Sequence, residues 1–423
     1  MLDFNSFLSN LKQLISFKSV NAEKEDGMPF GEQNYRALTF FLDLAKSMGF
    51  DTINYDGYGG EVYFGNGEEV GIIGHLDVVP TGIGWDSDPF NLTEKDGVLY
   101  ARGIVDDKTA PLLCLYALKE LKDSGKPLGR KIRLIVGCDE ESGWRDIDYI
   151  RSKTTIPEYG FSPDGNFPLS YAEKGITIVT FTLPLLKNFS CVKGGTVVNA
   201  VCDYATAIPT EKGVDEKLLK KHGLTLKDGV IESRGKASHG SAPHLGINAL
   251  KALFNYFADM GEDVGNVIEY LFNDKGGVAL IKNEQGITTL SPDIIKEEDG
   301  KIKIICDCRI PAPATLSDLM PVFDSFCIDY VATEKHPPVM VEKDGWFVDC
   351  LLSAYNEVTG DKATPISLGG STFARAFNKG CAFGPEFPNK DYNIHDANEH
   401  VSVDDLLKSY EIYKRAIFNL LVK

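Results

Sequence analysis

The segment that most constrains the fold is an apolar run of strand length at residues 71–74 (Gly-Ile-Ile-Gly), which continues into His75-Leu-Asp77 and soon meets Pro80. Such a run, ended by a proline, predicts a buried strand. Side chains alternate along a strand, so His75 and Asp77 lie on the same face. Open α/β sheets place their sites at the carboxyl ends of strands. The pattern therefore predicts an α/β sheet with a polar site at the end of this strand.

Acidic residues follow further predicted strands. The run at 131–137 leads into Asp139-Glu140-Glu141, the short strand from residue 159 closes on Asp164, and Asp106-Asp107 stand just before an apolar helix predicted over 109–122. Neutral imidazole and carboxylates suit zinc or a similar divalent ion. We expect the Asp77 carboxylate to fix the tautomer of His75.

The order of the predicted elements indicates two kinds of domain. Up to about residue 170, strands alternate with helices, which is typical of a mostly parallel sheet covered by helices on both faces. Between about 171 and 344, strands grouped around a helix at 246–260 indicate an inserted α+β domain, with a strand predicted over 197–208. Residues 345–423 resemble the first part again. We therefore expect a discontinuous catalytic domain, 1–170 and 345–423, with an inserted lid domain, 171–344.

Composition restricts the partners and the compartment. The net charge of -17 argues against nucleic acid and anionic membranes, because nothing would neutralise phosphates. The chain has nine cysteines but no Cys-x-x-Cys pattern, which favours reduced thiols over a cysteine zinc site. We find no apolar run of the roughly 18 residues that a bilayer span requires, nor a signal peptide at the N-terminus. These features together predict a cytoplasmic protein.

Each candidate residue also has an ordinary structural explanation. Glu140-Glu141 could form a solvated acidic turn, Asp164 after Ser-Pro could be a turn residue, and His395 could be a surface histidine. The Glu-Glu pair follows an apolar strand predicted to run parallel to the His75 strand, which favours a site over a solvated turn. The functional interpretation depends on the set of five candidate ligands, nearly all of them at strand ends.

These motifs, in this order and with this spacing, resemble metallopeptidase family M20 along nearly the whole chain, and its dipeptidase V-like branch most of all. The matching segments are His75-x-Asp77, Arg102-Gly-x-x-Asp106-Asp107-Lys108, Glu140-Glu141, Ser162-Pro-Asp164 and His395-Asp-Ala-Asn-Glu399. The resemblance implies two zinc ions, for which cobalt or manganese could substitute, bridged by Asp106. His75 and Asp164 would complete one metal site, and Glu141 and His395 the other. It also implies a cis peptide bond after Asp106.

The resemblance further implies a mechanism of amide hydrolysis. Two metal ions would activate a shared water and polarise the scissile carbonyl, and Glu140 would act as general base. His239, in Ser238-His-Gly, matches the family's lid histidine, which donates to the developing oxyanion, although a plain loop histidine fits the sequence equally well. The substrate contacts that the resemblance suggests are Asn199, Arg309, Gly370, Ser371 and Arg375, the arginines being suited to a carboxylate.

Two small departures from the family pattern border the substrate and concern specificity rather than chemistry. Thr109 stands where a glycine is usual after Asp-Asp-Lys, and residues 368–373 read Leu-Gly-Gly-Ser-Thr-Phe in place of Gly-Gly-Gly-Thr-Tyr. The long insert resembles the extended lid of the dipeptidase V-like branch, which implies a monomer.

The predicted function is a dinuclear zinc dipeptidase that acts on a short unblocked peptide. Three alternatives remain open at this point. The first is a deacylase of N-acyl amino acids or N-succinyl-diaminopimelate on the same fold. The second is a catalytically silent binding relative, and the third is an aminopeptidase with one metal ion.

Overall fold

The computed structural model describes residues 2–210 and 214–422. The chain forms two compact units, which are described separately. Unit 1 comprises Met1–Tyr171, Met340–Leu368 and Thr372–Lys423, and unit 2 comprises Ala172–Val339 and Gly369–Ser371. The sequence predicts an inserted domain with the limits 171–344, and the main segment of unit 2 has the limits Ala172–Val339. Gly370 and Ser371, which that prediction placed in the catalytic domain, group with unit 2.

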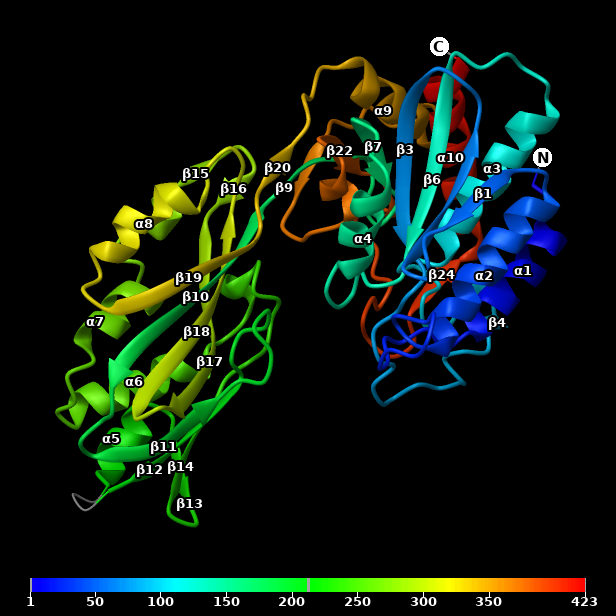
Figure 1. Ribbon diagram of the computed structural model, residues 1–423. Coiled ribbons are helices and arrows are strands. Elements are labelled where there is room, and N and C mark those ends of the chain that lie inside the picture. The colour runs from blue at the N-terminus through cyan, green and yellow to red at the C-terminus, as the bar shows by residue number, and fades with distance from the viewer. Residues whose placement is uncertain (1, 211–213, 423) are drawn as a thin grey trace. The chain divides into compact units, whose positions relative to one another are not determined.

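The core of unit 1 is a nine-stranded mixed sheet whose central strands are parallel (Figure 1). The parallel strands, in spatial order, are β6 (Arg130–Gly137), β3 (Glu68–His75), β7 (Tyr159–Ser162) and β22 (Lys379–Ala382). Antiparallel pairs add β1 (Asp51–Asn54) and β2 (Gly59–Phe64) at one edge and β9 (Ser170–Glu173) at the other. Beyond β22, β9 also pairs with β20 (Val339–Met340) and β21 (Ile366–Leu368). The predicted α/β class is confirmed, with parallel pairing in the centre.

Helices of unit 1 bury their apolar stripes against this sheet and each other. They are α1 (Phe4–Ser16), α2 (Glu32–Ser47), α3 (Thr109–Asp123), α4 (Arg145–Lys153), α9 (Trp346–Thr359) and α10 (Val403–Val422). Asp3 caps α1 by accepting the N–H of Ser6 at 3.2 Å. Helix α3 is buried on nearly all sides, because it packs against both β3 and α10. Small sheets flank the core: β4 (Thr93–Lys95) with β5 (Val98–Tyr100) and β24 (His400–Ser402), and β8 (Gly165–Asn166) with β23 (Pro385–Glu386).

Unit 2 contains an eight-stranded sheet in which all pairs are antiparallel. Its strands, in spatial order, are β13 (Thr225–Lys227), β14 (Val230–Arg234), β12 (Tyr204–Pro209), β11 (Phe189–Gly194), β17 (Thr289–Glu298), β18 (Lys301–Ile310), β10 (Gly175–Pro184) and β19 (Asp329–His336). Helix α6 (Ala249–Asp259) contributes Leu253, Phe254 and Phe257 to the apolar core. The other helices are α5 (Glu216–Lys221), α7 (Gly265–Val267) and α8 (Leu316–Asp324).

One expectation about local structure is wrong. The strand predicted over 197–208 begins only at Tyr204, so Asn199 lies in a loop. The chain turns at Gly195, whose φ of +70° is a conformation that glycine adopts freely, and a Cβ there would lie 1.9 Å from the Asp293 carbonyl oxygen. Within residues 365–399, the short strand β22 joins the sheet of unit 1.

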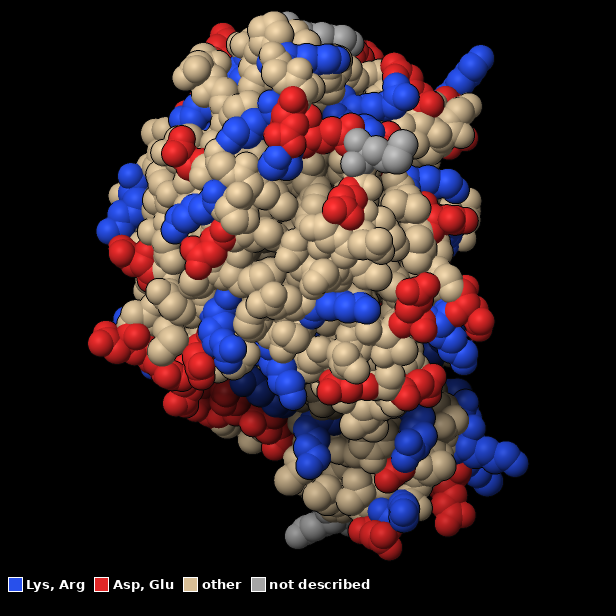
Figure 2. Space-filling model, turned by 90° about the vertical axis from the view of Figure 1, so that its right-hand side faces the viewer, with Lys and Arg blue, Asp and Glu red and all other residues tan. Residues whose placement is uncertain are grey.

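The surface carries charges of both signs. On the face shown in Figure 2, acidic and basic side chains are interspersed over much of the surface. Among residues 2–210 and 214–422, no helix is both long and apolar enough to cross a membrane.

Candidate metal centre

His75 is buried at the carboxyl end of β3 and held there by two hydrogen bonds. Its side chain is 1% exposed, and its backbone N–H donates to Oδ2 of Asp107 at 3.2 Å. Its Nδ1 lies 3.0 Å from the carbonyl oxygen of Asp77. A carbonyl oxygen can only accept, so Nδ1 carries a proton in this contact and Nε2 is the atom available to a ligand.

Asp106 lies between two imidazoles. Its Oδ1 is 2.9 Å from Nε2 of His75, and its Oδ2 is 2.9 Å from Nε2 of His395. The same His395 atom lies 3.1 Å from Oε1 of Glu141, and Nε2 of His75 lies 3.6 Å from Oδ2 of Asp164. The structure thus brings together all five residues that sequence reasoning selected as ligands, and the Asp106-Asp107 peptide bond is cis.

The donor atoms fit a divalent cation better than they fit hydrogen bonds to one another. Within the described part of the chain, Nε2 of His75 and Oδ1 of Asp106 are both buried without a hydrogen-bond partner, although they lie 2.9 Å apart. The candidate ligand atoms form two sets, and the atoms of each set all lie within 4.8 Å of one another. One set comes from His75, Asp106 and Glu141, and the other from His75, Glu140 and Asp164. Imidazole nitrogen with carboxylate oxygens suits zinc. The second set includes Glu140, which sequence reasoning selected as the base.

The electrostatics of the protein alone also favour a bound cation. Burial raises the pKa of Glu140 well above its usual range, and burial together with the Asp106 charge raises the pKa of Glu141 to about 7. Burial and the Asp106 charge raise the pKa of Asp164 as well. These carboxyls resist ionisation because they are buried close to one another. A divalent cation would relieve that repulsion and allow them to ionise.

Asp77 has a structural contact that sequence reasoning did not anticipate. Its Oδ1 lies 3.4 Å from Nδ1 of His75, whereas its backbone carbonyl oxygen lies only 3.0 Å from the same atom. Its carboxylate accepts the backbone N–H groups of Glu140 and Glu141, both at 3.2 Å. Asp77 therefore orients the Glu140-Glu141 turn in addition to lying beside His75.

Glu386 is an acidic residue near the centre that sequence reasoning missed. It belongs to β23, which pairs in parallel with β8, the strand that directly follows Asp164. Burial, followed by the charges of Asp164 and Asp106, raises the pKa of Glu386 to about 7. Its sequence context, Gly-Pro-Glu-Phe-Pro, is that of a turn, and only the strand pairing brings it near Asp164.

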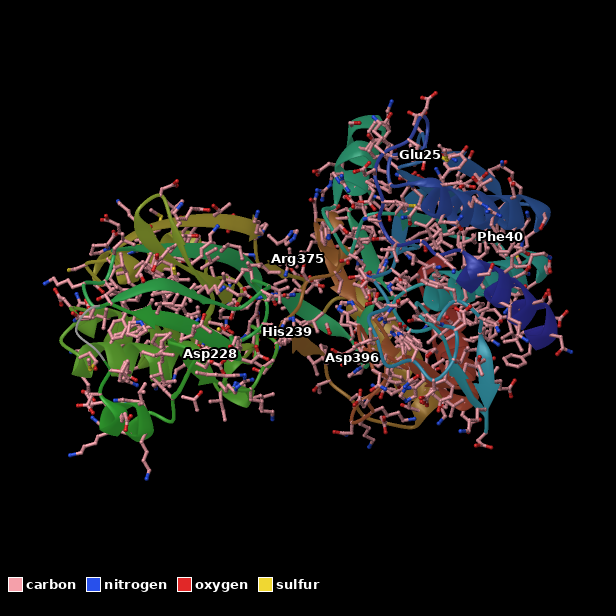
Figure 3. The ribbon with its side chains drawn as sticks, turned by 90° about the horizontal axis from the view of Figure 1, so that it is seen from below. Glu25, Phe40, Asp228, His239, Arg375 and Asp396 are labelled. Carbon is pink, nitrogen blue, oxygen red and sulfur yellow. The ribbon has the colours of Figure 1, made fainter. Side chains whose placement is uncertain are left out.

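His239 lies in unit 2, in the loop that follows β14 (Figure 3). Its Nδ1 accepts the backbone N–H of Ser241 at 3.1 Å and lies 2.7 Å from the Ser241 hydroxyl. An Nδ1 that accepts an N–H carries a lone pair, so in the neutral ring the proton is on Nε2. The Asn199 carbonyl oxygen accepts the N–H of Gly240 at 2.7 Å, so residues 199 and 240 form one loop cluster.

The two arginines expected to recognise a carboxylate are both largely buried. Arg309, in unit 2, is already paired: its Nε lies 2.9 Å from each carboxylate oxygen of Asp307, and its Nη1 donates to the Gly369 carbonyl oxygen at 3.3 Å. Arg375 lies in η4 (Phe373–Ala376) of unit 1. The substrate contacts predicted for Asn199, His239, Arg309 and Arg375, and for Gly370 and Ser371, remain predictions.

One histidine at a strand end, a second on a loop and carboxylates from distant segments lie close together, a set of ligands that is typical of metal-dependent hydrolases. Residues 71–419 match the model of Peptidase family M20/M25/M40, and the chain belongs to this family. It is therefore a hydrolase of the metallopeptidase class. The resemblance inferred from the motifs is confirmed at the level of the family.

Relatives and solved structures agree with this assignment. A Bacillus subtilis (strain 168) protein named "Putative dipeptidase YtjP" is 33% identical over 93% of this chain and 92% of its own. The fold is similar to that of the dipeptidase Dug1p from Saccharomyces cerevisiae, with a TM-score of 0.60, 14% identity, and 99% of this chain and 96% of that chain covered. It is also similar to aminopeptidase PepT from Bacillus cereus ATCC 10987, with a TM-score of 0.62, 14% identity and 99% of each chain covered.

Proposed function

We propose that this protein is a dinuclear zinc dipeptidase that hydrolyses short peptides with a free amino terminus. The observation that carries the proposal is the position of Asp106, whose two carboxylate oxygens each lie 2.9 Å from a different imidazole, His75 on one side and His395 on the other. A carboxylate in this position can bridge two cations. The relatives named as dipeptidases support the choice of substrate class.

The residues divide into two sets around Asp106. His75 and Asp164 would hold one cation, and Glu141 and His395 the other. Bound zinc ions would lower the pKa of a water molecule toward neutrality and polarise the scissile carbonyl. Asp107 is not among the ligands in this proposal, because its Oδ2 accepts the backbone N–H of His75.

Glu140 would take the proton from the attacking water and return it to the leaving amine. It lies beside the ligands, and Asp77 holds its backbone N–H. A general base works best when its pKa lies near the operating pH. Burial displaces the pKa of Glu140 upward from the ordinary carboxyl value, which is the direction that makes it a better base.

His239 would stabilise the oxyanion as a neutral donor. The contacts from Ser241 leave the proton on Nε2, and an N–H directed at developing negative charge stabilises the transition state. Asn199 would assist it. Arg375 and the remaining N–H groups of Arg309 would bind the substrate carboxylate, the Arg309 guanidinium being kept in one orientation by Asp307.

Glu386 favours an unblocked peptide over an N-acyl or N-succinyl amino acid. It adds a carboxylate to a centre that already contains Asp106 and Asp164, and no hydrogen bond or ion pair engages its side chain among the described residues. A free α-ammonium group would be attracted to this carboxylate, whereas a succinyl carboxylate would be repelled. This charge distribution supports a dipeptidase rather than a deacylase.

A substrate panel tests the proposal. Protein purified without chelator is assayed on unblocked dipeptides beside N-acetyl and N-succinyl amino acids, with its metal content measured on the same sample. We expect hydrolysis of the dipeptides and about two zinc ions per chain. Turnover of the acylated compounds alone would replace the proposal with the deacylase, and no turnover of either class would favour a silent binding relative.

We also propose a cytoplasmic monomer. The chain has nine cysteines and no Cys-x-x-Cys pattern, which fits reduced thiols in a reducing compartment.

A further inference from the structure

Two buried side chains outside the proposed ligand set, Arg102 and Glu399, form an ion pair beside the metal centre. Nη1 of Arg102 lies 2.8 Å from Oε2 of Glu399, and the two side chains are 1% and 0% exposed. A buried ion pair is by itself weak evidence for stabilisation, because the cost of desolvation can exceed the Coulombic attraction. The additional hydrogen bonds of this pair indicate what it does.

Glu399 holds the backbone that carries Asp106. Its Oε2 accepts the N–H of Gly103 at 2.9 Å, and its Oε1 accepts the N–H groups of Val105 and Asp106 at 2.8 and 3.2 Å. Hydrogen bonds to an ionised acceptor are about twice as strong as neutral ones. A single carboxylate thus fixes the loop between residues 103 and 106, and with it the position from which the Asp106 side chain projects.

Arg102 reaches the other two segments of the centre. Its Nη2 donates to the carbonyl oxygens of Pro80 at 3.4 Å and Asp396 at 3.3 Å, and its guanidinium lies 5.3 Å from the centre of the Trp85 ring. Pro80 follows the strand of His75, and Asp396, which Figure 3 labels, is the neighbour of His395. The pair therefore contacts the backbone on all three segments that carry His75, Asp106 and His395.

We propose that Arg102 and Glu399 are positioning residues that set the spacing of the two imidazoles across Asp106, and through it the affinity of the second cation. The inference rests on the proposed metal centre. It also predicts an asymmetry. The His75 side chain is 1% exposed at a strand end, whereas the His395 side chain is 54% exposed on a loop. Loss of the pair should weaken the cation held by Glu141 and His395 more than the one held by His75 and Asp164.

Titration of the full-length Glu399→Ala variant with Zn²⁺, in competition with a chromophoric chelator, tests this inference without using activity. For the wild type we expect two dissociation constants. In Glu399→Ala, we expect the weaker one to rise about 10–100-fold, the usual cost of removing a partner that orients ligands, and the tighter one to change little. Arg102→Lys keeps the positive charge but loses the planar guanidinium with its several N–H donors. It should therefore weaken the binding of the same cation by a smaller factor.

A matched control is a second buried pair of an arginine and a glutamate in unit 1, Glu61 on β2 with Arg133 on β6. Their side chains are 2% and 5% exposed, and Nε of Arg133 lies 2.7 Å from Oε1 of Glu61. Glu61→Gln should lower the unfolding temperature and leave both zinc constants unchanged. If Glu61→Gln weakens zinc binding as much as Glu399→Ala does, the positioning role is wrong.

The outcomes separate this inference from the proposed function. If the wild type binds fewer than two zinc ions, the dinuclear centre itself is wrong, and the inference falls with it. If the wild type binds two zinc ions, and the two zinc dissociation constants are unchanged in Glu399→Ala and in Arg102→Lys, the inference alone is overturned. Should Glu399→Ala fail to fold, the milder Arg102→Lys decides on the same criterion.

Discussion

Nε2 of His395 lies 2.9 Å from Oδ2 of Asp106, although 289 positions separate the two residues in the sequence. Neither residue could form this site through local structure, because His395 comes from a loop before the last helix and Asp106 from a loop before α3. Their proximity is the geometric basis of the proposed centre, and the predictions below test it in independent ways.

Removal of divalent cations should abolish hydrolysis and lower the unfolding temperature. A ligand that binds only the folded state stabilises it by about 2.7 kcal/mol at a concentration 100 times its Kd, and its removal leaves the carboxyls of Glu140, Glu141 and Asp164 close together. Differential scanning fluorimetry before and after dialysis against a chelator measures the shift. Addition of zinc should restore both stability and activity, and an unchanged unfolding temperature would argue against a structural metal centre.

Glu140→Ala and Glu141→Ala should have different effects although the residues are adjacent. Loss of a general base costs about 10²–10⁴-fold in kcat, so Glu140→Ala should be nearly inactive and still contain about two zinc ions per chain. Glu141→Ala should lose one zinc ion. Elemental analysis beside kcat separates the two roles.

The same experiment decides between two roles for Glu140, which lies within ligand distance of His75 and Asp164. If Glu140→Ala loses zinc, Glu140 is a ligand and another group must act as base. If it keeps both zinc and activity, Glu140 has neither role.

Glu386→Gln should change substrate preference more than turnover in general. The variant should lose the attraction between the Glu386 carboxylate and the α-ammonium group, and a loss of about 1.4 kcal/mol lowers affinity tenfold. We therefore expect kcat/KM for unblocked dipeptides to fall about tenfold. Any trace activity on N-acetyl amino acids should not fall. Asp391→Asn is the control, because Asp391 is an exposed acid nearby whose charge also acts on Glu386. Equal losses on blocked and unblocked substrates would show that Glu386 does not select the α-ammonium group.

Asp293→Asn should stabilise the protein increasingly as pH rises. Burial raises the pKa of Asp293 from its ordinary 3.8 to about 8, against a hydrogen bond from Ser291 that lowers it. Between these values the unfolded chain has released the proton and the folded chain has not, so the wild type loses stability as pH rises from about 4 to about 8. A tenfold difference in proton affinity between the two states corresponds to about 1.4 kcal/mol.

Urea unfolding of metal-free wild type and Asp293→Asn at pH 5 and pH 8 measures this difference. We expect the gap in unfolding free energy between the two proteins to be wider at pH 8 than at pH 5, by a few kcal/mol. Parallel pH profiles would mean that Asp293 ionises normally in the folded protein.

Periodicity and strand-end polarity predicted most of unit 1, because β3, β6 and α3 owe their structure to local apolar patterns. Strand β22 could not be predicted in this way. Its sequence, Lys379-Gly-Cys-Ala382, is short and has no apolar run, and its pairing with β7 depends on residues more than two hundred positions away.

The sequence predicted which residues lie close together at the proposed centre, but not the contacts that support them. Each proposed ligand stands in a recognisable motif, but the hydrogen bonds that Asp77 accepts from Glu140 and that Glu399 accepts from Val105 join distant segments. One missed contact did have a sequence signal. Asp307 and Arg309 stand two positions apart on a strand, and therefore on one face, so their pairing followed from strand geometry.

The place of β22 between β7 and β9 has a consequence for biosynthesis. The sheet stays open along one side of β7 while the ribosome is still translating unit 2, and the fifth proposed ligand, His395, is synthesised later still. A nascent chain that already contains His75, Asp106 and Glu141 therefore lacks a complete centre.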